Sequence, residues 1–277
     1  AKGRSWKMGA ANIYAQMDEM DRIGQPVLLN HEVTGIVREK PLDGRVLGLE
    51  VKYKNKKMYF KARRGVILAS GGFGANLAWV TQLDRRLAGT GTTNHPGATG
   101  ECIKYAQDIG ADTLHMDYIQ AIPLNDVRPP YKASFFLIES AEVRKASASM
   151  PYRIFVNKEG KRFVDESARR DVIKQAVLAQ PLFEPLPETK ADTIEELEAK
   201  LNLPKGSLVE TVRQYNAACD AKKDELLGKH PSVLVPLRTG FFKANSRAMQ
   251  RHHTMGGLLV RGTTGQVIDR TGKPIPG

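Results

Sequence analysis

Apolar and polar positions recur with two different periods along the chain, and each period predicts a different class of element. In residues 5–24 apolar side chains recur near helical spacing and the segment ends on Gly24, which predicts a helix with a glycine C-cap. The chain then breaks into short apolar or alternating runs separated by turn residues, which predicts strands. These predicted strands cover residues 26–30, 31–39, 45–53, 56–62 and 65–70, with turns at 42–44 and 54–56.

A helix is predicted again at residues 97–112, and from residue 118 to about 250 the pattern changes character. Prolines become frequent, and a short hairpin is predicted around NKEGKR (157–162). Helical spacing returns in this stretch at residues 166–179, 191–202 and 205–223. After Arg251 the pattern predicts a strand, a turn, a second strand and a second turn. The order favours an α+β or α/β fold in which a sheet domain is interrupted by a mainly helical one.

Composition places the chain among ordinary globular proteins, because its 277 residues are 41% hydrophobic and 26% charged. No apolar run approaches the 18 residues of a membrane-spanning helix, so a soluble protein is expected. The first residues, AKGRSWKMGAANIYAQ, contain neither an apolar signal core nor an initiator methionine, which suggests a mature or truncated start. The sequence therefore does not indicate the cellular compartment, and the bacterial cytoplasm and periplasm both fit.

The formal charge of +12 invites a nucleic-acid interpretation, but the basic residues fall in small clusters, of which 52–64 is the densest. No zinc-finger or RNP pattern accompanies them, so an exposed basic hairpin is favoured over nucleic-acid binding. A positive field would also attract a small anionic substrate. Cys102 and Cys219 make neither a disulfide framework nor a metal site, and we expect both to be structural.

Two stretches carry candidate chemistry, and the residues alone leave both open. VILASGGFGAN (66–76) is an apolar strand followed by glycines, where backbone can approach a cofactor closely. It is not a dinucleotide fingerprint, since Leu77 stands where the last glycine would be, and a plain strand–turn–helix connection remains the alternative. RHHTMGGLLV (251–260) is either a histidine-containing turn entering a strand or the edge of an active site.

Taken in order along the chain, five stretches resemble the flavoprotein superfamily of fumarate reductase and succinate dehydrogenase. The resemblance is nearest to the soluble flavocytochrome-type fumarate and urocanate reductases, and it covers almost the whole chain. The stretches are VILASGGFGAN, ATGECIKYAQDIGAD, DYIQAIP, FVNKEGKRFVDESARRD and HHTMGG…GKPIPG. The resemblance implies a partial FAD-binding domain at 1–117 and 252–277, interrupted by a mobile capping domain at 118–251.

The resemblance also implies a reaction, in which reduced FAD gives a hydride from N5 to the β-carbon of an α,β-unsaturated carboxylate. A cap arginine then supplies the proton; here ARRD assigns that role to Arg170, with Arg169 as the alternative register. His252 is implied to hold the substrate carboxylate, with Thr254 beside it. The positions implied to contact the flavin are Ser70, Gly71, Gly72, His253, Gly256 and Gly257.

The sequence departs from the family at positions that decide the substrate. Ile122 stands in YIQAIP where fumarate reductases have a histidine, and Ile138 precedes Glu139 where they have a threonine. Burying a second carboxylate without these donors would cost several kcal/mol, so we expect a substrate with one carboxylate and an apolar or aromatic far end. Nearby aromatic residues would suit a ring or would simply belong to the core of the cap; they are Tyr131, Phe135 and Phe136.

A relay that returns a proton to the arginine is expected from a glutamate and a second arginine. Both Glu139 and Glu142 lie near Arg144 in sequence, and the Glu142–Arg144 pair is the weaker of the two assignments because the spacing is irregular.

The family's N-terminal glycine-rich motif and its C-terminal glycine cluster have no counterpart here, so we expect an internal piece of a larger flavoprotein. Its expected partners are the missing flavin-domain segments or an electron-donor domain or protein, and FAD binding by the chain alone is in question. Two rival functions are a flavin dehydrogenase of the ketosteroid dehydrogenase kind and a substrate-binding fragment without redox activity. HHTMGG and ARRD argue against the dehydrogenase, since the resemblance ties them to carboxylate binding and arginine acid chemistry.

Overall fold

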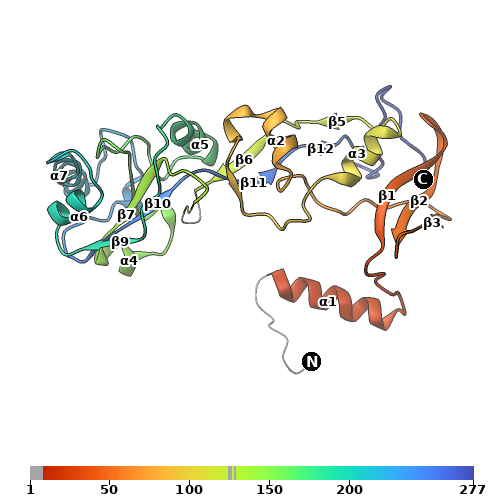
Figure 1. Ribbon diagram of the computed structural model, residues 1–277, viewed down its shortest axis with the longest axis horizontal. Coiled ribbons are helices and arrows are strands. Elements are labelled where there is room, and N and C mark those ends of the chain that lie inside the picture. The colour runs from red at the N-terminus through yellow and green to blue at the C-terminus, as the bar shows by residue number, and fades with distance from the viewer. Residues whose placement is uncertain (1–8, 124–126, 128) are drawn as a thin grey trace. The chain divides into compact units, whose positions relative to one another are not determined.

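The computed structural model describes residues 9–123, 127 and 129–277, which form two compact units (Figure 1). The first unit contains the chain up to Leu68 together with Tyr105–Ala111 and Val260–Gly277. The second unit contains Ala69–Lys104 and Asp112–Leu259. The boundary between them falls inside helix α3 (Glu101–Asp108).

The first unit consists of a helix and a three-stranded antiparallel sheet. Helix α1 (Gly9–Arg22) ends as expected, because Gly24 adopts a φ of 69° and the following Gln25 N–H donates to the carbonyl of Met20. The sheet has the order β1-β2-β3, and its strands are β1 (Glu32–Lys40), β2 (Asp43–Tyr53) and β3 (Lys56–Lys61). Every residue of β3 is exposed, which confirms the expected basic hairpin with a solvated face.

Two predicted strands of this region, 26–30 and 65–70, are not strands in the structure. Ile67 is 93% exposed and Leu29 is 72% exposed, although both lie in apolar runs. An apolar run becomes a buried strand only when a neighbouring strand pairs with its backbone, and periodicity in the sequence does not report that partner.

The second unit contains two small sheets next to the glycine-rich segment 71–74. The three-stranded sheet has the order β4-β11-β6, with β4 (Gly91–Thr92) parallel and β6 (Ile119–Ile122) antiparallel to β11 (Gln250–Thr254). The pair β5 (Thr113–Leu114) and β12 (Gly257–Leu258) forms the other sheet. Helix α2 (Leu77–Leu83) follows the glycines, and the Asn76 side chain caps it by accepting from the Trp79 N–H.

A four-stranded antiparallel sheet with the order β8-β7-β10-β9 forms the rest of the second unit, together with four helices (Figure 1). The strands are β7 (Phe135–Glu139), β8 (Ile154–Val156), β9 (Thr189–Ala191) and β10 (Phe242–Arg247). The helices are α4 (Ala141–Ala146), α5 (Arg170–Leu178), α6 (Ile194–Lys200) and α7 (Ser207–Asp220). Short 3-10 turns lie at Arg85–Leu87, Met150–Tyr152 and Pro231–Val233. The cap region was predicted to be mainly helical, but it contains a four-stranded sheet as well as its helices.

Strand β7 is buried on both faces, which settles the place of Phe135 and Phe136 but not that of Tyr131, which is 45% exposed. Phe136 and Ile138 pack in a core with α6 and α7, whereas Phe135 and Leu137 pack in a second core with α5. All four are at most 5% exposed. Phe135 and Phe136 are thus core residues, and the expectation that they would suit a substrate ring is not supported by their burial.

The second core also includes Phe73, Val80 and Leu87, so the glycine-rich segment packs with the cap strands in one unit. The mixture of helices and sheets agrees with the predicted fold class. The functional boundaries at 117 and 251 stay a prediction. Among the described residues, no helix has the length and apolar character needed to cross a membrane.

Candidate active site

Strands β6 and β11 present one polar face of the small sheet. Side chains alternate along a strand, so Gln120 and Ile122 share a face of β6, while Ile119 and Ala121 turn into the core and are at most 4% exposed. His253 of β11 lies opposite Gln120, and the register is irregular between Arg251 and His253. His252 lies at that irregularity.

Arg170 is the first residue of α5, and it reaches the polar face of the sheet. Its Nη1 donates to Oε1 of Gln120 at 2.8 Å, and its positive charge contributes to a lowered pKa of His252. The larger causes of that lowered pKa are burial of the ring and the neighbouring His253. Arg170 and Gln120, which lie far apart in sequence, are therefore in contact on this face, and the charge of Arg170 also acts on His252.

His252 is held by Thr93 and by its neighbouring ring. Nδ1 of His252 lies 2.6 Å from the Thr93 hydroxyl, and the rings of His252 and His253 are 3.8 Å apart between centroids. When the Thr93 hydroxyl donates to Nδ1, the neutral imidazole carries its proton on Nε2. Nε2–H is then a donor available to an anionic ligand.

The glycine-rich segment contacts β11 through backbone and hydroxyl groups. The Phe73 N–H donates to the Thr254 hydroxyl at 3.4 Å, and a Cβ on Gly72 would lie 2.1 Å from that oxygen, so only glycine fits there. Arg251 is 4% exposed, and its Nε donates to the Gly74 carbonyl at 3.0 Å. Burial lowers the pKa of Arg251, whose Nη1 also donates to the Thr90 carbonyl and hydroxyl. Thr254 thus contacts the glycine segment.

Four of the six positions assigned to the flavin are open to the close approach of a flat ring. Gly71 has a φ of 80°, and a Cβ built there or on Gly257 would meet no atom within 4 Å. Ser70 and His253 are exposed. A Cβ on Gly256 would instead lie 2.2 Å from the His115 carbonyl oxygen, so this glycine serves the packing of backbone on backbone. The open glycines and the His253 edge fit a flavin.

Glu139 lies at the end of β7 with three cations around it. Its Oε2 accepts from Nε of Arg153 at 2.5 Å, while Arg144 Nε and Lys243 Nζ lie 4.0 and 3.8 Å from Oε1. The Glu139 side chain is 5% exposed and that of Arg153 is 12% exposed, so this pair is largely shielded from water. Arg153 carries no sequence signal, because it stands in an irregular stretch before an apolar strand.

Glu142 has a different role in the structure. Its Oε2 accepts from the backbone N–H groups of Arg238 and Thr239 at 2.9 and 3.1 Å. Arg144 lies against the Phe241 ring, 4.1 Å from its centroid, and within reach of Glu139. Residues two apart on a helix face different directions, which explains why Glu142 and Arg144 turn to different partners.

The two isoleucines of the predicted substrate site lie in different surroundings. Ile122 is 3% exposed and shares the face of β6 with Gln120, whereas Ile138 is fully buried in the core of the cap. A substrate contact by Ile138 stays a prediction that its burial does not support. Gln120 and Thr93 were not assigned from sequence; Gln120 stands inside the quoted DYIQAIP stretch, which was the available signal. Among the described residues, no group of three or more His, Cys, Asp or Glu side chains is arranged to hold a metal ion.

Comparison with known proteins gives the same family along the whole chain. The FAD binding domain family matches residues 1–277. An NADH:acrylate oxidoreductase from Vibrio harveyi is 31% identical over 265 residues, covering 85% of this chain and 25% of its own length. A cytochrome-type fumarate reductase from Shewanella frigidimarina is 32% identical over 270 residues, covering 90% of this chain and 45% of its own length.

Solved structures agree on the fold. The open conformation of a flavocytochrome c3 fumarate reductase superposes with a TM-score of 0.70 at 27% identity, covering 97% of this chain and 49% of the other. A 3-ketosteroid-Δ4-(5α)-dehydrogenase from Rhodococcus jostii gives a TM-score of 0.69 at 25% identity, covering all of this chain and 58% of the other. The chain spans about half or less of the length of the curated relatives described above. It belongs to the FAD binding domain family, and FAD is the cofactor that this membership assigns to it.

Proposed function

We propose that the protein reduces the C=C bond of an α,β-unsaturated carboxylate, and that this chain supplies the residues that bind and protonate the substrate. The observation that carries the proposal is the hydrogen bond from Arg170 to Gln120 on the sheet whose strand β11 carries His252 and contacts the glycine segment. Relatives named for acrylate, fumarate and urocanate reduction support the reaction class.

In this proposal the bound FAD supplies a hydride for the β-carbon. His252 donates from Nε2 to the substrate carboxylate, in the tautomer in which the Thr93 hydroxyl donates to Nδ1. Arg170, oriented by Gln120, gives a proton to the α-carbon, so that hydride and proton together saturate the double bond. A guanidinium gives up a proton only in a desolvated site where another group reloads it. Arg170 is exposed in this chain, so in this proposal bound FAD and substrate would have to cover it. Glu139, held by Arg153, is the carboxylate that we propose for the reloading.

The proposed substrate carries one carboxylate. Ile122 shares a face of β6 with Gln120 but is only 3% exposed, so a substrate would reach it only at a position already closed to water. A second carboxylate there would lose its water without gaining a donor. An acrylate with an apolar or aromatic far end fits this surface better than fumarate. Electrons for FAD would come from a separate domain or protein.

Introducing a hydrogen-bond donor in place of Ile122 should broaden the substrate specificity. Ile122→His is expected to raise the ratio of kcat/KM for fumarate to kcat/KM for acrylate about tenfold. That factor is about what one hydrogen bond to a charged group contributes. Ile122→Leu is the control, since it keeps the apolar surface. Steady-state rates with a reduced viologen dye would measure both substrates. A wild-type protein that already prefers fumarate would overturn the single-carboxylate assignment.

Substrate affinity should depend on the protonation of His252. Because its pKa is lowered, the ring is neutral at pH 7 and becomes charged only as the pH falls below its ordinary range near 6.5. The charged ring makes a stronger bond to a carboxylate, so KM for acrylate is expected to fall about fivefold as the pH is lowered toward 5. The unfolded chain binds this proton more readily, so stability falls in the same window.

Titrating KM and Tm together from pH 8 to pH 5 would check this expectation. His252→Gln should remove the pH dependence of KM, and His95→Gln, at an exposed position, should keep it. A KM that depends on pH equally in both variants would assign the titration to another group.

A further inference from the structure

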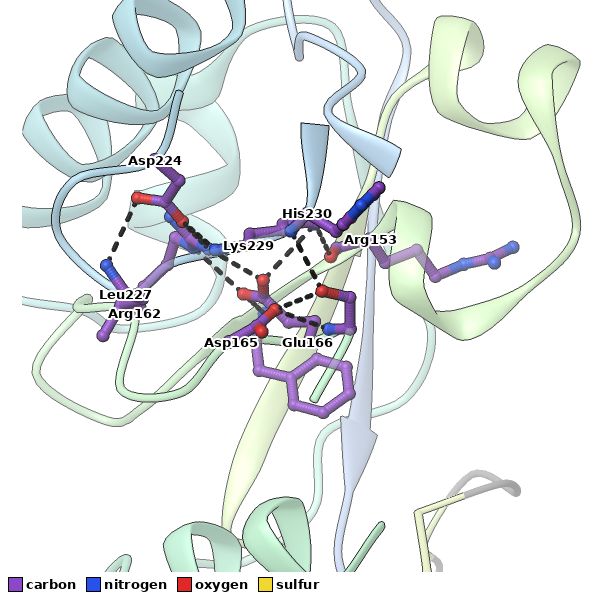
Figure 2. Close-up of polar contacts among 10 residues, drawn as sticks. Arg153, Arg162, Asp165, Glu166, Asp224, Leu227, Lys229 and His230 are labelled. Atoms are coloured by element: carbon purple, nitrogen blue, oxygen red, sulfur yellow. Dashed lines mark hydrogen bonds and ion pairs between the residues drawn. The ribbon is translucent and has the colours of Figure 1, made fainter. Parts of the chain in front are cut away.

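We propose that a clasp between two pairs of adjacent residues, buried at Glu166 and Lys229, positions Arg170 for catalysis. The clasp is formed by Glu166 and Ser167 on one side and by Lys229 and His230 on the other. Figure 2 shows Glu166 together with Lys229 and His230. The inference rests on the proposed function, because it concerns how Arg170 is held in that reaction. All four residues lie outside the set assigned from the sequence.

Glu166 is the centre of the clasp. Its Oε1 accepts from the Phe155 N–H and from Arg162 Nε, both at 3.0 Å, and its Oε2 accepts from Arg162 Nη2 at 2.8 Å. Lys229 Nζ lies 3.3 Å from Oε2 and donates to the Arg153 carbonyl at 2.7 Å. Figure 2 shows Lys229 reaching both groups. Glu166 thereby joins strand β8 to the segment that carries Lys229.

The charges of the cluster balance. Arg162 Nη2 also pairs with the Asp224 carboxylate at 2.9 Å, so two cations face two carboxylates. The side chains of these four residues are at most 3% exposed, and those of Glu166 and Lys229 are fully buried. Because their side chains are almost fully buried, these residues do not act on the substrate directly. Their effect on a reaction has to pass through the residues that they hold.

Ser167 forms the second half of the clasp. Its hydroxyl donates to the Asp165 carboxylate at 2.6 Å and accepts from the His230 N–H at 3.1 Å. The same carboxylate oxygen accepts from the Ser167 N–H at 2.7 Å, which closes a tight turn. The turn therefore has its side chain fixed on the backbone that follows Lys229.

The held turn leads directly into α5. The Ala168 N–H donates to the Asp165 carbonyl, and Arg170 follows as the first residue of the helix. One helical turn further on, Lys174 Nζ donates to Asp84 Oδ2 at 2.9 Å and to the Ile119 carbonyl at 3.0 Å. The start of α5 is thus fixed from both sides, by the clasp before Arg170 and by Lys174 after it. This fixes the point from which Arg170 reaches Gln120.

The mildest test removes only the hydroxyl of the clasp. In the FAD-loaded protein, Ser167→Ala is expected to lower kcat about tenfold, because a small displacement of a positioned group is costly. KM should change less than about twofold, since His252 lies on a different element. Hydrogen exchange of the Ala168 and Ile173 amides, which reports the turn and the first helical turn, should quicken about tenfold.

Two control variants separate positioning from general loosening. Ser167→Thr keeps the hydroxyl and should restore both kcat and the exchange rates. Ser149→Ala, at an exposed serine whose side chain caps nothing, should leave both unchanged. Lys229→Met tests the other half of the clasp and should likewise lower kcat and quicken the exchange of the Ala168 and Ile173 amides.

The outcomes distinguish a failure of the positioning role from a failure of the proposed function. Faster exchange in Ser167→Ala with an unchanged kcat would overturn the positioning role, provided that Arg170→Ala is inactive. An active Arg170→Ala variant would instead overturn the proposed function. In that case the exchange rates would still decide whether the clasp holds the turn.

Discussion

Replacing Arg170 by alanine is expected to lower kcat for enoate reduction by about a thousandfold, within the range that a positioned proton donor contributes. The reason is local: Arg170 is the cation that reaches Gln120 and whose charge acts on His252. Because His252 lies on β11 and stays in place, KM for the carboxylate should change much less than kcat. Steady-state kinetics with a reduced dye and acrylate would measure both constants.

The neighbouring arginine is a matched control for this variant. Arg169 has an 82% exposed side chain that pairs with Asp171, so Arg169→Ala should keep nearly the full rate. The two variants also decide the register of the ARRD motif. A large loss in Arg169→Ala with a normal rate in Arg170→Ala would move the proton donor by one residue and contradict the assignment.

Removing the charge of Glu166 should cause the largest loss of stability of any substitution considered. Glu166→Gln keeps the size of the side chain but leaves Arg162 and Lys229 buried without their shared carboxylate. Burial opposes the charge of Arg162, and Glu166 and Asp224 more than offset it, so the pKa of this guanidinium is raised. Breaking such a network from one side costs about 3–5 kcal/mol of the free energy of unfolding.

Urea denaturation would measure this loss, with Glu225→Gln as the control. Glu225 pairs with Lys223 at the surface, where both side chains are more than 70% exposed, so its loss should have little effect. Equal midpoints for the Glu166 and Glu225 variants would mean that the cluster contributes no net stability. The role of Glu166 would then be restricted to positioning.

The helices were predictable where one amphipathic face packs on a sheet. The segments predicted at 166–179, 191–202 and 205–223 contain α5, α6 and α7 with shorter ends. The hairpin around residues 157–162 is confirmed by the bond from the Asn157 N–H to the Lys161 carbonyl and by the bridge from Val156 to Arg162.

Elements that depend on a distant partner were not predictable in the same way. The apolar run at 65–70 has the composition of a buried strand, but Ile67 is almost fully exposed. The cap sheet was underestimated because β7 pairs with β10, about a hundred residues further along the chain. Pairing across such a separation leaves no local signal in the sequence.

The residues of the candidate site also divide into those with a signal in the local sequence and those without one. Arg170, His252 and the glycines stand in motifs that the resemblance picks out, and the structure brings Arg170 and His252 close enough for their charges to interact. Arg153 and Lys229 stand in no motif, and their roles follow from burial and from contacts across the fold. Only the three-dimensional arrangement could assign them.

The most direct test of the central claim is a single turnover. The protein would be loaded with FAD, reduced without oxygen and mixed with acrylate while flavin absorbance is followed. The account predicts rapid reoxidation with one equivalent of saturated acid formed, and loss of this reaction in Arg170→Ala. Flavin that stays reduced with acrylate and fumarate, but is reduced from its oxidised state by a saturated 3-ketosteroid, would contradict it and identify a dehydrogenase.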